Sequence, residues 1–492
     1  MTIVKTKATD GSDVTFEFAN PRQGGVKDVY FDPNRRYAVA FFRKKLDPNG
    51  KDRLERLVGQ YRKGIFEQSG ADYWRSLFRW PEKIVEHNGL TGIVVPFYEP
   101  EFFFGDQTSL DGVEKDGKWF ASAKNFNRFV PPEEKGNLLG YLRICLNLSR
   151  AVRRLHAAGL AHSDLSYKNC LVNPSSGGAC IIDIDGLVVP GLFPPDVVGT
   201  PDFIAPEVVA TLHLSKNDPN RKNPRRETDQ HALAVLIYQY LLHRHPLRGS
   251  KIHSHDTDEQ DRLEMGERAL FIENPRDKTN RYIVNKQGDK DFLPWVDADK
   301  LPYTILGPYL KILFDQAFIE GLHEPSRRPT ADNWEDALIK TCDLVQPCQN
   351  KKCVKGWYVF DNTTRPICPY CGEPFRGQLP VLDFYSSRNG VDFRPDQRRL
   401  MVYNNQYMYR WHSDRSVFPN ERLSEADKKP VGYFVFHQSR WIFINQTLTG
   451  LKDLNAQRQV APGEYVELKD GVQLLLSPEK TGRLVHVSLV QC

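Results

Sequence analysis

Three polar side chains between residues 164 and 183 have the types and the spacing that phosphoryl transfer requires. Asp164 and Asn169 lie close together in a polar stretch, and Asp183 follows the next apolar segment. One carboxylate can orient an attacking hydroxyl and accept its proton, while a second carboxylate and an amide oxygen can hold magnesium against the phosphates of ATP. We therefore expect Asp164 to be the catalytic base, and Asn169 and Asp183 to be the magnesium ligands.

Two apolar runs can place these groups on one hairpin. Residues 170–172 and 180–182 flank a glycine-containing turn at 175–178, so the two metal ligands would lie at the ends of neighbouring strands. Upstream, residues 137–158 repeat apolar side chains at helical spacing and stop at Gly159, a typical helix end. This helix is predicted to lead the chain into the polar stretch.

The order of residues 162–169 (His-x-Asp-Leu-x-x-x-Asn), followed by Asp183, resembles the catalytic and metal-binding loops of the protein kinase fold. Ala-Pro-Glu at 205–207, Asp229 before an apolar helix, and Arg328 follow in the order of a kinase C-lobe. The Ala-Pro-Glu segment shapes a peptide-binding surface in such folds, which disfavours a small-molecule kinase.

The resemblance implies an α+β, bilobal protein kinase domain over residues 1–345, with an N-lobe of residues 1–97 and a C-lobe of residues 98–345. It also implies a buried pair between Glu207 and Arg328. Asp229 would hold the backbone of the catalytic loop.

Gly24, Gly25 and Lys27 lie where a kinase folds a glycine-rich loop over the ATP phosphates. Glycines let backbone N–H groups approach phosphate oxygens closely. The same residues also suit a plain hairpin turn. Lys27 could therefore be a phosphate ligand or a solvated turn lysine.

The strand expected at residues 37–43 lacks the lysine with which kinases hold the α- and β-phosphates, because Phe42 occupies that position. Strand alternation puts Lys44 on the face of Phe42, whereas a β-bulge would bring in Arg43. Both alternatives stay open beside a third, a solvent-exposed basic strand end.

Further nucleotide contacts follow from the same resemblance. Glu55, on a helix expected over 51–66, could pair with the phosphate-binding cation or be a solvated glutamate. Pro96 and Tyr98 lie at the expected hinge, whose backbone would bind the adenine edge. Lys168 could contact the γ-phosphate or be a surface lysine.

Three more residues in or near the catalytic loop bear on how the kinase would be regulated and how it would bind metal and substrate. Ser163 stands where many kinases carry an arginine that gathers an activation-loop phosphate, so we expect activity without that phosphorylation. Asp185 replaces a glycine of the metal-binding motif, and a turn-shaping role is favoured over a magnesium contact. Thr200 is expected to be positional in the substrate-binding turn, although it could also be phosphorylated.

Two close cysteine pairs predict a zinc ribbon over residues 346–377. Four thiolates satisfy tetrahedral zinc, and no position is left open for catalysis. Because the segment is too small for a core of its own, the metal would supply its folding energy. The expected structural zinc ligands are Cys348, Cys353, Cys368 and Cys371.

Residues 378–492 alternate apolar and polar side chains in short runs, which is typical of an all-β sandwich. One of the strands expected from these runs covers residues 407–411. Residues 441–474 resemble the second half of a forkhead-associated domain. A clear counterpart of the Gly-Arg and Ser-x-x-His phosphothreonine-binding pattern is missing, which favours a protein-docking sandwich.

The totals fit a soluble, multidomain protein. The chain has 492 residues with 40% hydrophobic and 26% charged side chains, and its net charge of +5 is small against 67 basic and 62 acidic residues. We therefore expect no nucleic-acid and no membrane partner. Scattered cysteines outside the two pairs and the absence of a signal-peptide core indicate the reducing cytoplasm.

The layout of kinase lobes, zinc ribbon and forkhead-associated-like sandwich resembles the bacterial kinases of the tellurite-resistance-associated (TerY-P) phosphorylation triad. That resemblance implies an ATP- and Mg²⁺-dependent serine/threonine kinase. Its substrate would be a von Willebrand A domain protein, with a metal-dependent phosphatase as the antagonist. The alternative is a pseudokinase scaffold that binds nucleotide and assembles partners through the ribbon and sandwich, which the missing strand lysine favours.

Overall fold

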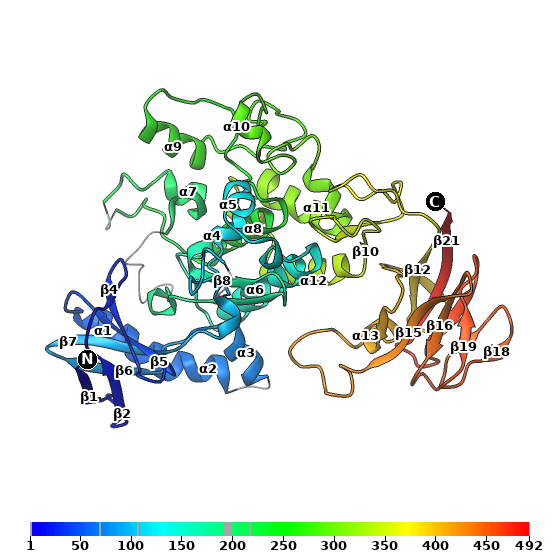
Figure 1. Ribbon diagram of the computed structural model, residues 1–492, viewed down its shortest axis with the longest axis horizontal. Coiled ribbons are helices and arrows are strands. Elements are labelled where there is room, and N and C mark those ends of the chain that lie inside the picture. Colours follow the sequence, from blue (N-terminus) through cyan, green and yellow to red (C-terminus); the bar gives the residue numbers. More distant parts are fainter. Residues whose placement is uncertain (1, 68–69, 106–107, 190–198, 216–217, 492) are drawn as a thin grey trace. The chain divides into compact units, whose positions relative to one another are not determined.

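The computed structural model describes residues 2–67, 70–105, 108–189, 199–215 and 218–491 (Figure 1). The chain separates into two compact units. The first comprises Met1–Gly136, Gly140–Asp299 and Leu313–Glu335, and the second comprises Asn137–Leu139, Lys300–Ile312 and Asp336–Cys492. None of the described helices is both long and apolar enough to span a bilayer.

An antiparallel five-stranded sheet forms the N-lobe of the first unit (blue in Figure 1). Its order is β3-β4-β5-β7-β6, and a separate hairpin of β1 and β2 shares an apolar cluster with it through Phe16, Phe41 and Val85. The bounds are β1 (Ile3–Lys7), β2 (Asp13–Glu17), β3 (Arg22–Gln23), β4 (Lys27–Phe31), β5 (Tyr37–Phe42), β6 (Lys83–His87) and β7 (Leu90–Pro96).

The helical segment between β5 and β6 is longer and less regular than predicted. It consists of α1 (Pro48–Arg56), a π-helical turn (Leu57–Tyr61), α2 (Arg62–Phe66) and α3 (Ala71–Leu77). Asp47 begins α1, because its side chain accepts a hydrogen bond of 2.7 Å from the Gly50 N–H.

The predicted helix before the catalytic loop is confirmed as α6 (Leu138–Ala157), and the predicted hairpin is confirmed as β8 (Cys170–Asn173) and β9 (Gly178–Ile181). α8 (Arg226–Leu242) is buried along nearly its whole length. The other C-lobe helices are α4 (Lys118–Ala121), α5 (Ala123–Arg128), α7 (Pro206–Val209), α9 (Thr257–Met265), α10 (Gln287–Lys290), α11 (Pro308–Asp315) and α12 (Ala331–Cys342).

Two antiparallel sheets sharing one apolar cluster make up most of the second unit. The six-stranded sheet has the order β13-β12-β21-β20-β17-β18, and the four-stranded sheet has the order β14-β15-β16-β19. The bounds are β12 (Gln378–Ser387), β13 (Phe393–Met401), β14 (Tyr407–Tyr409), β15 (Pro430–His437), β16 (Arg440–Asn445), β17 (Lys452–Asp453), β18 (Arg458–Gln459), β19 (Tyr465–Glu467), β20 (Gln473–Leu475) and β21 (Arg483–Gln491).

One predicted strand of the sandwich is wrong in its second half. Residues 407–411 were expected to be a strand, but β14 ends at Tyr409 and a short helix, α13 (Arg410–Ser413), follows. The Tyr409 N–H donates to His412 Nδ1 at 3.0 Å, which turns the chain. A local side-chain acceptor thus overrides the aromatic β-propensity of Trp411.

The ribbon segment shares a core with the sandwich instead of standing alone. β10 (Val345–Pro347) pairs with β11 (Trp357–Val359). Tyr358, Phe360 and Cys368 belong to one buried cluster with Leu379, Val381 and Met401. The segment therefore has no core of its own, as predicted, but neighbouring strands supply apolar surface that adds to any stabilisation by a metal.

Candidate functional site

A cavity of about 650 Å³ lies in the first unit between the N-lobe sheet and the β8–β9 hairpin. This volume suits a nucleotide-sized ligand. One part is apolar and the other is charged. The apolar lining includes Val29, Ala38, Ala40, Ile93, Val95, Leu171 and Ile182, and the charged lining includes Lys27, Lys168, Asp183 and Asp185.

The predicted catalytic base is fixed from two sides. The Asn169 amide donates to Asp164 Oδ2 at 2.9 Å and to the Asp164 carbonyl at 2.7 Å. Thr200 donates to Asp164 Oδ1 from its N–H at 2.7 Å and from its hydroxyl at 2.9 Å. Because the Asn169 amide nitrogen is engaged, its oxygen is the atom suited to a metal.

Buried contacts hold the backbone of the catalytic loop. Asp229, only 1% exposed, accepts from the His162 N–H at 2.8 Å and from the Ser163 N–H at 3.3 Å. Ser163 has a φ of 64°, a left-handed conformation that these bonds help to maintain. The anchoring role expected for Asp229 is confirmed.

The expected pair between Glu207 and Arg328 is also confirmed. Arg328 Nη1 and Nη2 donate to the two carboxylate oxygens of Glu207 at 2.8 and 2.7 Å, a bidentate arrangement. The Arg328 side chain is 1% exposed and donates further to the carbonyls of Gly321, Leu322 and Glu227. This pair joins the segment after the catalytic loop to the end of the C-lobe.

The cation that contacts Asp183, a predicted magnesium ligand, comes from β4. Lys27 Nζ lies 3.0 Å from Asp183 Oδ1 and 2.7 Å from Asp185 Oδ1. Lys27 is directly opposite Phe42 in the β4–β5 register, and residues opposite each other project to the same side of a sheet. Lys27 therefore occupies the region that a lysine at position 42 would reach.

Contacts between opposite charges decide the direction in which the pKa values of Lys27 and Asp183 shift. Although burial alone would lower the pKa of Lys27, the Asp185 and Asp183 carboxylates raise it. Burial would raise the pKa of Asp183, but the Lys27 ammonium holds it below its usual value. Lys27 and Asp183 are therefore both ionised at neutral pH.

Three residues predicted to bind the nucleotide, Arg43, Lys44 and Glu55, do not contribute to the described cavity lining. Arg43 Nε donates to Asp28 at 2.9 Å, and the side chains of Lys44 and Glu55 are exposed. Among the described residues that line the cavity, none of these three appears, and Gly25 is also absent whereas Gly24 is present. The β-bulge that would bring in Arg43 is not observed, since β5 pairs with β4 in unbroken register.

The hinge residues and Lys168 do line the cavity. Pro96 and Tyr98 follow β7, and burial raises the pKa of the Tyr98 phenol well above its usual value. Lys168 is exposed on the cavity edge. Two residues that the sequence did not predict, Arg22 and Glu114, also line the cavity and form an ion pair, with Arg22 Nη2 2.6 Å from Glu114 Oε2. Their separation along the chain left no local signal.

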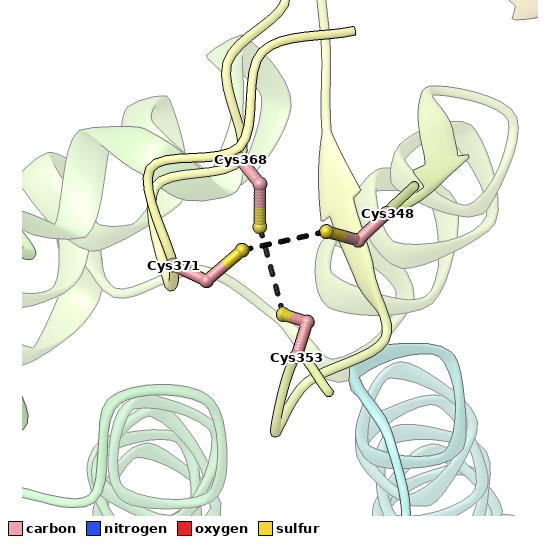
Figure 2. Close-up of side chains that lie close together, drawn as sticks. All are labelled: Cys348, Cys353, Cys368 and Cys371. Atoms are coloured by element: carbon pink, nitrogen blue, oxygen red, sulfur yellow. Dashed lines mark hydrogen bonds between the residues drawn. The ribbon is translucent and has the colours of Figure 1, made fainter. Parts of the chain in front are cut away.

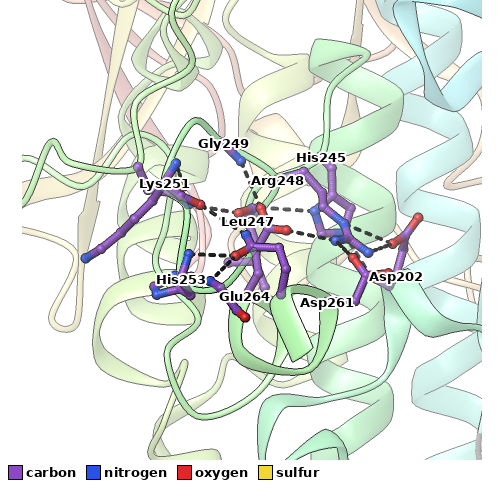
Figure 3. Close-up of polar contacts among 12 residues, drawn as sticks. Asp202, His245, Leu247, Arg248, Gly249, Lys251, His253, Asp261 and Glu264 are labelled. Carbon is purple, nitrogen blue, oxygen red and sulfur yellow. Dashed lines mark hydrogen bonds and ion pairs between the residues drawn. The ribbon is translucent and has the colours of Figure 1, made fainter. Parts of the chain in front are cut away.

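A polar cluster supports the turn that follows Thr200 (Figure 3). His245 Nε2 lies 2.9 Å from the Asp202 carbonyl, and Arg248 Nη2 donates to Asp202 Oδ1 at 2.8 Å. Arg248 Nη1 donates to Asp261 at 2.5 Å and to Glu264 at 2.8 Å. The cluster holds the backbone that presents Thr200 to the catalytic base. The positional role expected for Thr200 is therefore supported by its contacts.

The four paired cysteines converge in the second unit (Figure 2). Their sulfur atoms all lie within 4.8 Å of one another, with Cys348 and Cys371 Sγ 3.5 Å apart and Cys353 and Cys368 Sγ 3.7 Å apart. Zinc with Zn–S bonds of about 2.3 Å in a tetrahedron requires sulfur separations of about 3.8 Å. The donor set and its spacing therefore fit zinc.

The C-lobe matches known kinases in sequence. Residues 137–332 match the family model of the protein kinase domain. Over 117 residues, the chain is 27% identical to serine/threonine-protein kinase YPK3 of Saccharomyces cerevisiae. This alignment covers 21% of this chain and 20% of the yeast protein. The chain thus matches about a fifth of the length of this curated relative.

A solved structure is also similar. It is the crystal structure of a Toxoplasma gondii specific rhoptry antigen kinase domain, with 12% sequence identity, 69% of this chain and 86% of that chain covered, and a TM-score of 0.41. The family match over residues 137–332 includes the predicted base Asp164, the predicted magnesium ligands and the Glu207–Arg328 pair. The chain carries a protein kinase domain.

Proposed function

We propose that this protein is an ATP- and Mg²⁺-dependent protein kinase that phosphorylates serine or threonine on a partner protein. The observation that carries the proposal is the contact of Lys27 with Asp183 at the charged end of the cavity. A cation, a metal-ligand carboxylate and a nucleotide-sized cavity are thereby brought together. Serine/threonine specificity is supported by the relative named above.

The geometry suggests how each residue contributes. Asp164 would orient the substrate hydroxyl and accept its proton as the hydroxyl oxygen attacks the γ-phosphorus. The bond from the γ-phosphorus to the β–γ bridging oxygen would break, and ADP would leave. Asn169 Oδ1 and Asp183 would hold magnesium, whose charge offsets that of the phosphate oxygens. Lys27 and Lys168 would contact the phosphates, and the apolar lining would enclose the adenine ring. Thr200 fixes the Asp164 carboxylate without taking part in the chemistry.

The partners follow from the family layout described above. The substrate would be a von Willebrand A domain protein, and a metal-dependent protein phosphatase would reverse the modification. The ribbon and the forkhead-associated-like sandwich would recruit these partners. The Cys348–Cys353–Cys368–Cys371 cluster would hold a structural zinc ion, supported by the sulfur separations.

A binding role for the sandwich has an observation of its own. A cavity of about 520 Å³ lies among its loops and is lined by charged residues, hydroxyl side chains and apolar residues, including Arg410, Lys429, Thr447 and Leu476. A mixed polar and apolar cavity of this size suits a peptide segment of a partner. If the kinase domain were inactive, this feature would favour the scaffold function.

The test is transfer of the γ-phosphate from labelled ATP with magnesium, onto the protein itself and onto a von Willebrand A domain protein. Wild type is compared with Asp164→Asn and Asp183→Asn. We expect transfer that both substitutions abolish. Nucleotide binding without transfer by the wild type would instead favour the scaffold, and transfer that survives both substitutions would contradict the assigned roles.

A further inference from the structure

We propose that Asp185 is the positioning residue for Lys27 and replaces the helix carboxylate that orients the phosphate-binding lysine in a protein kinase. In kinases, that lysine forms an ion pair with a glutamate of an N-lobe helix. The inference rests on the proposed function, because it assumes that Lys27 acts on the phosphates of ATP.

Two carboxylates contact Lys27, and they differ in exposure. Asp185 Oδ1 is the nearer, at 2.7 Å, and the Asp185 side chain is 11% exposed. Asp183 Oδ1 lies at 3.0 Å, and its side chain is 57% exposed. An exposed carboxylate in the cavity can turn toward a metal ion, whereas the less exposed one can remain with the lysine. Lys27 would then keep one partner when Asp183 binds magnesium.

The local backbone holds Asp185 in place. Asp183 has a left-handed φ of 59°, and the next residues form a 3₁₀ turn, Ile184–Gly186. Ile184 is buried at 1% exposure and anchors this turn. Immediately afterwards, Val188 and Ala161 exchange two backbone hydrogen bonds of 2.8 and 3.0 Å. The turn is thereby fixed to the start of the catalytic loop.

The helix glutamate that was expected to pair with the phosphate-binding cation is Glu55. Glu55 is exposed on α1 and, among the described residues, does not belong to the cavity lining. Lys27 projects from β4, on the same side as Phe42, with Nζ 5.6 Å from the Phe42 ring centroid. The lysine–acid pair is therefore made between a strand and the metal-binding turn. It follows that a shift of α1 would not break this pair.

The experiment is a double-substitution cycle in the full chain, with Lys27→Met, Asp185→Asn and both together. We expect Asp185→Asn to lower kcat between about tenfold and a hundredfold, because a misplaced lysine fails chiefly in the transition state. The double variant should be within about twofold of Lys27→Met, since a residue acting through Lys27 has no effect without it. Asp185→Glu, which keeps the charge, should recover part of the rate.

Two further measurements separate positioning from other roles. The Mg²⁺ concentration for half-maximal rate should be unchanged in Asp185→Asn. If Asp185 were a metal ligand, its loss would raise that concentration. The matched control is Asp28→Asn, which removes a β4 carboxylate paired with Arg43. Glu55→Gln should also retain the wild-type rate. The proposal would be overturned by any of three outcomes. These are independent effects of Lys27→Met and Asp185→Asn on the rate, a raised Mg²⁺ requirement in Asp185→Asn, and a large loss of rate in Glu55→Gln.

Failure of this inference can be distinguished from failure of the proposed function. If the wild type transfers no phosphate, the same cycle is measured as the affinity for a fluorescent ATP analogue. Coupling of about threefold or more between the two substitutions would still support the pair. Additive effects on nucleotide affinity would overturn it. Thermal unfolding of each variant establishes that the proteins compared are folded.

Discussion

Replacement of Lys27 by methionine tests whether β4 supplies the phosphate-binding cation. Methionine keeps much of the side-chain length and removes the charge. Lys27 is 12% exposed and lies within hydrogen-bonding distance of two carboxylates at the charged end of the cavity. It is therefore held where the phosphates of a bound nucleotide would lie.

The expected loss follows from the kind of contact that is removed. A hydrogen bond to a charged group contributes about 1.5–3 kcal/mol. If Lys27 makes one such bond to the phosphates in the transition state, kcat/KM for ATP should fall between about tenfold and 150-fold. Lys27→Arg keeps the charge but changes its geometry, so it should fall between the wild type and Lys27→Met.

The assay is steady-state phosphoryl transfer over a range of ATP concentrations, with folding monitored by thermal unfolding. Lys44→Met and Arg43→Met are the matched controls, because the first removes an exposed lysine and the second an arginine paired with Asp28. Both should retain rates within about twofold of the wild type. Loss of activity in either control, with activity retained in Lys27→Met, would show that β4 does not supply the phosphate-binding cation.

Three further predictions concern stability and metal content. Arg328→Met should lower the free energy of unfolding by about 3–5 kcal/mol, because Glu207 loses its bidentate partner, and Glu207→Gln in the same chain should recover part of the loss in calorimetry. Burial lowers the pKa of His245 from 6.5 to about 4, so the unfolded chain takes up a proton between these values that the folded chain does not. Stability should therefore fall by about 1–3 kcal/mol as pH decreases from 6.5 to 4, and His245→Gln should flatten this dependence in denaturant titrations. Elemental analysis should find one zinc ion per chain, lost in Cys353→Ser and kept in Cys342→Ser, and chelation should lower the unfolding temperature of the sandwich because the ribbon shares its core. A zinc content unaffected by Cys353→Ser would contradict the assigned site.

Local sequence patterns predicted much of the catalytic loop and its supports. The α6 helix and the β8–β9 hairpin follow from apolar periodicity, and Asp164, Asn169 and Asp183 follow from their spacing along one short segment. These features are local, so the chain order limits how far apart they can lie. Each cysteine pair is also a local feature, because few residues separate its two members.

The cation that contacts Asp183 and Asp185 could not be identified without the tertiary structure. Lys27 and Asp185 are far apart in the sequence, and strand alternation around Phe42 pointed to Lys44 instead. Alternation describes which face of one strand a residue occupies, but the cavity is also reached from the neighbouring strand. Cross-strand register placed Lys27 opposite Phe42, and register depends on the pairing of whole strands. Spacing along one short segment was therefore enough to predict the catalytic loop, whereas the pairing of β4 with β5 decides which cation contacts its neighbouring carboxylates.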